Sequence, residues 1–269
     1  MEAKVDVECH EKTTALQIQL SFLLRQLIIP HSGHWQLTDY NQLCNVCPLL
    51  KGHLSHMATF HGWCVAGADR IVAYMISRNR ISQPEYCFKE SCLVGHVSVV
   101  KLLYPLLDPT YPIKYEIPNI FRHVCADGYL DMAQWLYQTF HLTSDEVKTF
   151  NNYAFIESCA GGHLDVAQWL HYTFRSTPKE DNEINNRAFS GACSGGHLDV
   201  VQWLYETVHI TPEGANRAFR SGCANGHLKV VLWLHEMFQF THEEIRMSDN
   251  YAFNNSCVMG HLLVAQWLH

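Results

Sequence analysis

The sequence has few basic residues for its length. It carries 19 Lys and Arg against 26 Asp and Glu in 269 residues, which gives a net charge of -7. No basic surface is therefore expected that could displace the counterions of nucleic-acid phosphates. We expect no nucleic-acid partner.

Long apolar runs are also missing. The stretch from Leu20 to Ile29 is interrupted by Arg25 and Gln26. It is too short to cross a bilayer, and it lacks the small-residue cleavage site of a signal peptide. We therefore expect a soluble, intracellular protein without a membrane partner.

Signatures of catalysis are the third absence. The sequence contains no recognisable phosphate-binding loop, paired-carboxylate signature or Ser/His/Asp set. We expect no enzymatic activity, no catalytic residues and no cofactor.

What the sequence does contain is an internal repeat, marked by seven glycines at intervals of 28, 33, 34, 34, 30 and 34 residues. We call them the turn glycines: Gly67, Gly95, Gly128, Gly162, Gly196, Gly226 and Gly260. Seven positions before each stands a frame phenylalanine: Phe60, Phe88, Phe121, Phe155, Phe189, Phe219 and Phe253. Three positions before each stands a frame cysteine: Cys64, Cys92, Cys125, Cys159, Cys193, Cys223 and Cys257. So regular a spacing predicts seven copies of one structural unit.

Each unit is predicted to be a pair of helices. A frame phenylalanine and its frame cysteine are four residues apart, so they share one face of a first helix, which the turn glycine ends. A second helix follows with its own apolar stripe, such as Leu198, Val200, Val201 and Leu204. Tryptophans at a fixed place in five second helices are expected to pack between units. Because one pair cannot bury both apolar faces, the pairs are expected to stack in an array.

Cysteine usage fits this interpretation. The chain has 11 cysteines, and seven of them are frame cysteines. Such a pattern is typical of small core residues in a reducing compartment, not of a disulfide framework.

The run from Ala188 to Leu204, with Gly196-His197-Leu198 followed by Val200-Val201 and Leu204, resembles the ankyrin repeat. The resemblance implies an all-α, helix-turn-helix solenoid over residues 57–269. Because such arrays need atypical terminal units, residues 1–56 are expected to form an N-terminal helical cap. The resemblance also implies that the histidine after the turn glycine orders the turn. The Trp-Leu pairs are similar to those of divergent ankyrin repeats in large DNA viruses and protists. A viral protein of this kind would work in the cytoplasm of its host.

The linkers depart from the ankyrin pattern. In place of the Gly-Ala-Asp-rich hairpin stand three Thr-x-x-Glu capping boxes, at 143–146, 177–180 and 241–244. We therefore expect the β-hairpin fingers to be largely absent. Four asparagines recur just before the frame phenylalanines and are interpreted as helix N-caps, or as a ladder of amides for a ligand: Asn152, Asn186, Asn216 and Asn250.

The resemblance implies a protein partner, bound by positions that vary between units. Two such positions follow each frame phenylalanine, and two precede each turn glycine. The candidate partner-binding residues are Lys89, Glu90, Leu93, Val94, Arg122, His123, Asp127, Glu157, Ser194, Arg220, Asn225, Asn254 and Met259. Small residues dominate the second pair in the middle units, which favours a helix or extended segment over a small molecule.

Two further hypotheses concern the ends of the sequence. Cys44, Cys47, His53 and His56 are ligand types suited to tetrahedral zinc, so the alternative function is a zinc-stabilised recognition module at the N-terminus with the repeats as scaffold. The spacing between these pairs is shorter than in zinc fingers, and no metal is favoured. At the other end, Val264, Trp267 and Leu268 are expected to be exposed, and to mediate end-to-end self-association or partner binding, or else to fray.

Overall fold

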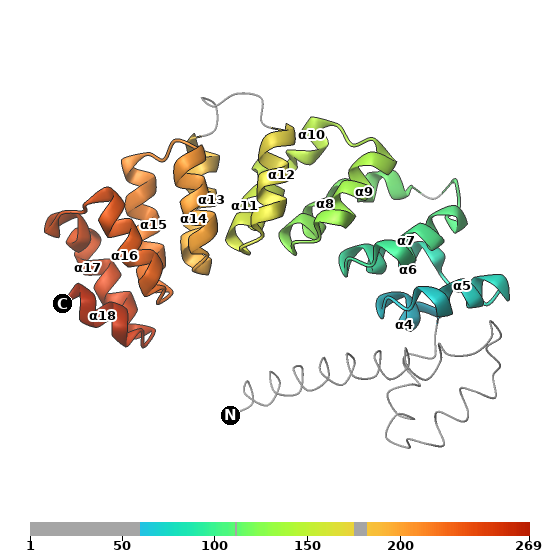
Figure 1. Ribbon diagram of the computed structural model, residues 1–269, viewed down its shortest axis with the longest axis horizontal. Helices are drawn as coiled ribbons and strands as arrows, with labels where there is room; N and C mark the ends of the chain where they lie inside the picture. Colours follow the sequence, from blue (N-terminus) through green and yellow to red (C-terminus); the bar gives the residue numbers. More distant parts are fainter. Residues whose placement is uncertain (1–59, 111, 175–181) are drawn as a thin grey trace, which may run out of the picture. The chain divides into compact units, whose positions relative to one another are not determined.

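The computed structural model describes residues 60–110, 112–174 and 182–269. These residues form α-helices and one short 3-10 helix, and no β-strand occurs among them (Figure 1). The helices follow one another in pairs, so the expected all-α helix-turn-helix array is confirmed. Among these residues, no helix combines the length and the apolar character needed to cross a membrane.

Seven helix pairs correspond to the seven turn glycines. The first helices are α4 (Phe60–Val65), α6 (Pro84–Leu93), α8 (Ile113–Ala126), α11 (Thr149–Ala160), α13 (Asn182–Gly195), α15 (Pro212–Ala224) and α17 (His242–Val258). The second helices are α5 (Asp69–Ser77), α7 (Val97–Leu103), α9 (Leu130–Phe140), α12 (Leu164–Phe174), α14 (Leu198–Thr207), α16 (Leu228–Phe238) and α18 (Leu262–Leu268). Neighbouring first helices pack against each other, as α13 does on α11 and α15. The second helices contact one another in the same way, as α16 does with α14 and α18.

The turn between the helices of a pair depends on its glycine. Gly196 has a φ of +78°, a conformation in which a Cβ atom is strained. The N–H of Gly196 donates to the carbonyl of Cys193, and the N–H of His197 donates to that of Ala192 at 3.0 Å. These bonds satisfy carbonyls that the end of α13 leaves without helical partners. All seven turn glycines have positive φ angles, so the predicted role of this position is confirmed.

Frame phenylalanines and frame cysteines form the core between neighbouring first helices. Phe88, Phe121, Phe189 and Phe219 are almost completely buried. The frame cysteines are buried in the first six pairs, and only Cys257 of the last pair is exposed. None of the eight cysteines among the described residues is in a disulfide, which agrees with their interpretation as core residues.

The tryptophans of the second helices are half-buried and contact the preceding pair. The ring centroid of Trp135 lies 6.2 Å from that of Phe88, and Trp169 lies 6.1 Å from Phe121. Trp203 and Trp267 have the same relation to Phe155 and Phe219. The prediction that these tryptophans pack between repeats is confirmed, although none of them reaches full burial.

Threonines are the N-caps of three helices that follow linkers between the pairs. Thr143 caps the short helix α10 (Ser144–Val147), and Thr241 caps α17, each in a capping box with the glutamate three residues later. Thr211 caps α15 through a bond from the N–H of Gly214. The linker between α7 and α8 contains the 3-10 helix η1 (Tyr104–Leu106). The third predicted capping box, at 177–180, lies outside the described residues.

The prediction that the recurring asparagines are N-caps is wrong, because the first helices begin several residues earlier. Asn186 lies inside α13 and binds the start of the next first helix instead. Its Oδ1 accepts the N–H of Thr211 at 3.1 Å, and its Nδ2 donates to the Thr211 hydroxyl at 2.9 Å. Asn152 and Asn250 lie within α11 and α17 at φ values of +56° and +57°, a region that asparagine tolerates better than most residues.

Candidate partner-binding surface

The histidine that follows the turn glycine contributes to the stacking of the pairs. His227 lies over Gly196 of the preceding pair, and its Nε2 is 2.8 Å from the carbonyl oxygen of Ser194. His96 lies over Gly67 and makes the equivalent contact with Val65 at 2.9 Å. These histidines therefore connect neighbouring repeats. The expected role was only to order the turn of their own repeat.

Metal ligands do not gather anywhere in the described part of the chain: no three His, Cys, Asp or Glu side chains there are close enough to hold an ion. The proposed zinc ligands Cys44, Cys47, His53 and His56 lie outside the described residues. The zinc alternative stays a prediction.

Several of the predicted partner-binding residues make contacts with the neighbouring repeat of the stack. Lys89 of α6 forms an ion pair with Glu116 of α8, with 2.8 Å between Nζ and Oε2. The Nδ2 of Asn225 donates to the hydroxyl of Ser194 in the preceding pair at 3.0 Å. The residue at these positions differs from repeat to repeat. At Lys89, Ser194 and Asn225 the side chain binds a neighbouring repeat, so the differences also determine how the repeats fit together.

Arg122 contacts both the next first helix and residues of its own helix. Its guanidinium lies 4.8 Å from the ring centroid of Tyr153 in the next first helix, a cation–π geometry. It also contacts Asn119 one turn earlier on α8 and lies 3.3 Å from Nε2 of His123. Arg122 and Tyr153 thus form a joined basic and aromatic surface over α8 and α11.

The other predicted residues divide by exposure. Asp127, Asn225, Asn254 and Met259 are exposed, and Met259 keeps 64% of its surface accessible. The half-buried ones are Glu90, Leu93, Val94, His123, Glu157, Ser194 and Arg220. None of the predicted residues is buried, so all of them lie at the surface of the first helices or their turns.

Sequence reasoning missed one position on this surface, two residues before the frame phenylalanine. A residue two positions away on an α-helix is rotated by about 200°, so it points away from the buried phenylalanine. We call these residues the outward row: Tyr86, Asn119, Tyr153, Arg187, Arg217 and Tyr251. Tyr86 and Tyr251 are 49% and 47% exposed. The helical period that located the buried face would have located this row as well.

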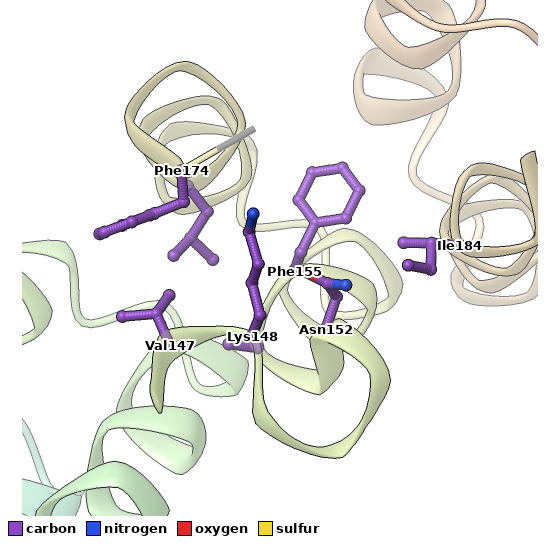
Figure 2. Close-up of a pocket in the computed structure, with 8 residues that line it drawn as sticks. Val147, Lys148, Asn152, Phe155, Phe174 and Ile184 are labelled. Carbon is purple, nitrogen blue, oxygen red and sulfur yellow. The ribbon is translucent and has the colours of Figure 1, made fainter. Parts of the chain in front are cut away.

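A hollow bordered by α10, α11, α12 and α13 is too small to be a ligand-binding site. Lys148, Phe155, Phe174 and Ile184 are among its lining residues, and the Lys148 side chain runs between Phe155 and Phe174 (Figure 2). It offers about 20 Å³ to the centre of a water-sized molecule, which is room for about one water. This hollow cannot hold a small-molecule ligand.

The last helix pair exposes apolar side chains. Val258, Met259, Leu262 and Leu263 are 81%, 64%, 65% and 66% exposed, and we call this group the terminal face. A ring from the following pair covers each of the first six turn glycines, whereas an added Cβ at Gly260 would meet nothing within 4 Å. The prediction of an exposed apolar end is confirmed, but its residues were misassigned. Val264 is buried, while Trp267 and Leu268 are half-buried.

Part of the chain matches a known protein family. Residues 191–235, from the end of α13 through most of α16, match a model of the ankyrin repeats (many copies). The comparison with curated proteins gives no match. The matched stretch contains two turn glycines in the same frame that runs through all seven pairs. Residues 191–235 are therefore similar to ankyrin repeats, and the described residues form an all-α, ankyrin-like helical solenoid.

Proposed function

We propose that the chain is an adaptor without enzymatic activity that binds a partner protein along the exposed side of its first helices. Ankyrin repeats are in general protein–protein interaction modules, and residues 191–235 match them. The observation that carries the proposal is the outward row, which places one variable side chain outward on each of six successive first helices.

The chemistry of the row supports protein recognition. Five of its six members are Tyr or Arg, residue types that dominate the binding energy of protein interfaces. Beside them, near the turns, lie the small side chains of Ala126, Ala160, Ser194 and Ala224. The rings and guanidinium groups form one row across the first helices, and the small residues form a second row about two helical turns further along. Together the two rows make a shallow surface. Such a surface suits a helix or an extended segment of a partner.

A capture experiment with matched variants tests this proposal. The tethered chain is exposed to an extract of its source cells, and bound proteins are quantified by mass spectrometry. Arg217→Ala with Tyr251→Ala removes one cation and one ring from the outward row. The control, Lys229→Ala with Tyr172→Ala, removes the same groups from exposed sites on the second helices α16 and α12.

Proteins that the wild type and the control retain, and that the row variant loses, would identify the partner. If every captured protein survives both changes equally, the outward row is not the binding surface. A captured partner can then be purified and titrated against the wild type, the row variant and the control. The three dissociation constants show whether the row variant was not captured because it binds the partner more weakly.

Self-association is a second, weaker element of the proposal, and it rests on the terminal face. Apolar patches of this kind on soluble proteins commonly mark interaction sites. Leu262→Glu with Leu263→Glu changes two side chains that are about two-thirds exposed, so the fold should be retained. Sedimentation at increasing concentration should show dimers for the wild type and monomers for this variant. Monomers of both would refute self-association.

The thiols also bear on where the protein works. We propose that it works in a reducing compartment, the cytoplasm, and in that of a host cell if the Trp-Leu repeats reflect a viral source. That none of the eight described cysteines is in a disulfide supports this. The net charge of -7 supports the absence of a nucleic-acid partner.

A further inference from the structure

Four consecutive members of the outward row have a symmetric order of side chains. From α11 to α17 they are Tyr153, Arg187, Arg217 and Tyr251, so two arginines lie between two tyrosines. None of the four is buried, and Tyr251 is 47% exposed. The helices that carry them pack in series, α11 against α13, α13 against α15 and α15 against α17. Equivalent positions on helices packed in this way lie about 8–10 Å apart.

The two arginines lie on helices that carry no acidic residue beyond their first turns. The range Ile184–Gly195 of α13 contains no Asp or Glu, and neither does the range Gly214–Ala224 of α15. Arg220 adds a third cation to the same region. Because the whole chain has a net charge of -7, these arginines form a local basic patch on an acidic protein. An anionic segment is attracted to this patch and repelled by the rest of the surface.

Two glutamates stand close to the arginines in the sequence. Glu183 and Glu213 lie four residues before Arg187 and Arg217, in the exposed first turns of α13 and α15. Acidic side chains are favourable there because they interact with the N-terminal end of the helix. In the part of the chain that the structure describes, neither glutamate forms an ion pair with the arginine that follows it. Exposed pairs at this spacing are weak, so both guanidinium groups can bind carboxylates of a partner.

The side chains between the two arginine-bearing helices are small and polar. The hydroxyl oxygens of Ser190 and Ser221 lie 3.1 Å apart, and the Nδ2 of Asn225 donates to the Ser194 hydroxyl at 3.0 Å. A helical partner places its apolar face in a hydrophobic groove, which these side chains do not provide. Hydroxyls and amides suit an extended segment in the polyproline II conformation, because the backbone of that conformation makes no internal hydrogen bonds.

The geometry of the polyproline II conformation matches the spacing of the four residues. It has about three residues per turn and rises about 3.1 Å per residue, so every third side chain points the same way at intervals of about 9 Å. Neighbouring first helices are about 8–10 Å apart. Successive members of the row can therefore contact every third residue of one segment. Tyrosine rings suit prolines in this arrangement, since aromatic side chains line the surfaces that bind proline-rich segments.

We propose that these four residues bind an acidic polyproline II segment of the partner with the pattern Pro-x-x-Glu-x-x-Glu-x-x-Pro, in which Asp can replace Glu. The prolines lie on Tyr153 and Tyr251, and the two carboxylates pair with Arg187 and Arg217. The pattern has the same order of contacts in both chain directions, so it fits the symmetric row either way. This inference rests on the proposed function and names the chemistry of the partner.

The test measures the binding of fluorescein-labelled peptides to the folded, full-length chain by fluorescence polarisation. The probe is Pro-Ala-Ser-Glu-Ala-Ser-Glu-Ala-Ser-Pro. One control peptide has glutamine in place of both glutamates, and the other has the same composition with the glutamates adjacent. The probe should bind about tenfold more tightly than the glutamine peptide, the effect of two exposed ion pairs, and its affinity should fall as salt is added. The adjacent peptide should bind more weakly than the probe, because its carboxylates cannot reach both arginines.

Matched variants assign this preference to the row. Arg187→Gln with Arg217→Gln should abolish the preference for the probe over the glutamine peptide. The control, Arg70→Gln with Lys229→Gln, removes two charges from exposed sites on the second helices α5 and α16 and should keep it. Arg187→Glu with Arg217→Glu should instead prefer a peptide with lysine in place of both glutamates. Circular dichroism and the melting temperature check the fold of each variant, and the comparison of peptides on the wild type requires no variant.

The acidic segment is overturned if the wild type binds the probe no more tightly than the glutamine peptide, or binds neither. It is overturned equally if the preference survives Arg187→Gln with Arg217→Gln. Equal binding of the probe and the adjacent peptide would refute the three-residue spacing. The proposed function is tested separately by capture. A partner that is lost with Arg217→Ala and Tyr251→Ala, while the probe fails to bind, would leave the outward row as the binding surface and exclude an acidic segment of this kind.

Discussion

Replacing Gly196 by alanine separates two physical roles that the turn glycine combines. The first role is conformational, because Gly196 has a φ of +78°. An L-residue in the left-handed region costs about 1–2 kcal/mol. The second role is steric, since a Cβ at this position would lie 2.4 Å from Nδ1 of His227. The ring would have to move, and its 2.8 Å contact with the Ser194 carbonyl would be lost, at about 0.5–1.5 kcal/mol. Together these terms predict a loss of about 1.5–3.5 kcal/mol for Gly196→Ala.

A double-mutant cycle isolates the steric role. In a His227→Ala background the ring is already absent, so Gly196→Ala should cost only the backbone term of about 1–2 kcal/mol. The coupling energy of the cycle should therefore be about 0.5–1.5 kcal/mol. Gly260→Ala provides a further comparison, because its φ is +76° and nothing lies within 4 Å of the added Cβ.

Urea unfolding followed by circular dichroism and by tryptophan fluorescence measures these differences. Both signals are needed because repeat arrays can unfold in parts, and coincident transitions show that one free energy describes the change. The reasoning fails if Gly196→Ala costs the same in both backgrounds. In that case the ring over the glycine would be a consequence of stacking and not a contributor to it.

Three further predictions concern the core, a helix cap and a thiol. Phe189→Ala should cost about 3–5 kcal/mol in urea unfolding, and Trp203→Ala less, because Phe189 is fully buried and Trp203 is half-buried. Bonds from the backbone N–H and hydroxyl of Thr241 lower the pKa of Glu244. The stability that they add is present above the usual glutamate pKa and is lost as pH falls through the lowered one. Glu244→Gln should therefore flatten the acid side of the melting-temperature profile. Among the frame cysteines, Cys257 alone should be alkylated by iodoacetamide in the folded protein, as peptide mapping would show.

The repeat frame could be predicted because each of its positions accepts few residue types. A buried helix contact that recurs at every repeat needs the same shape each time, as the full burial of Phe88, Phe121, Phe189 and Phe219 shows. A turn with positive φ needs glycine each time. These requirements leave a period in the sequence, and the period is sufficient to locate the seven helix pairs and the turns within them.

The starts of the first helices could not be placed in this way. Asn186 stands where an N-cap would fit a short helix, yet α13 begins four residues earlier at Asn182. Its side chain binds Thr211, which is 25 residues away. An asparagine side chain can satisfy a backbone N–H of its own helix or of the next one, and local sequence does not distinguish the two. The register between repeats decides, and that register is a property of the stack.

The same register explains why variation alone is an incomplete guide to the binding surface. Positions that differ between repeats include pairs such as Ser194 with Asn225 and Lys89 with Glu116, which bind one another across neighbouring helices. A change at one of these positions alters the fit between repeats as well as the exposed surface. The outward row is different, because its side chains lie opposite the frame phenylalanines and none of them is buried. Where one of its members does meet a neighbour, as Tyr153 meets Arg122, the contact leaves an arginine and a ring at the surface. Partner specificity should therefore follow the outward row more closely than the positions beside the turn glycines.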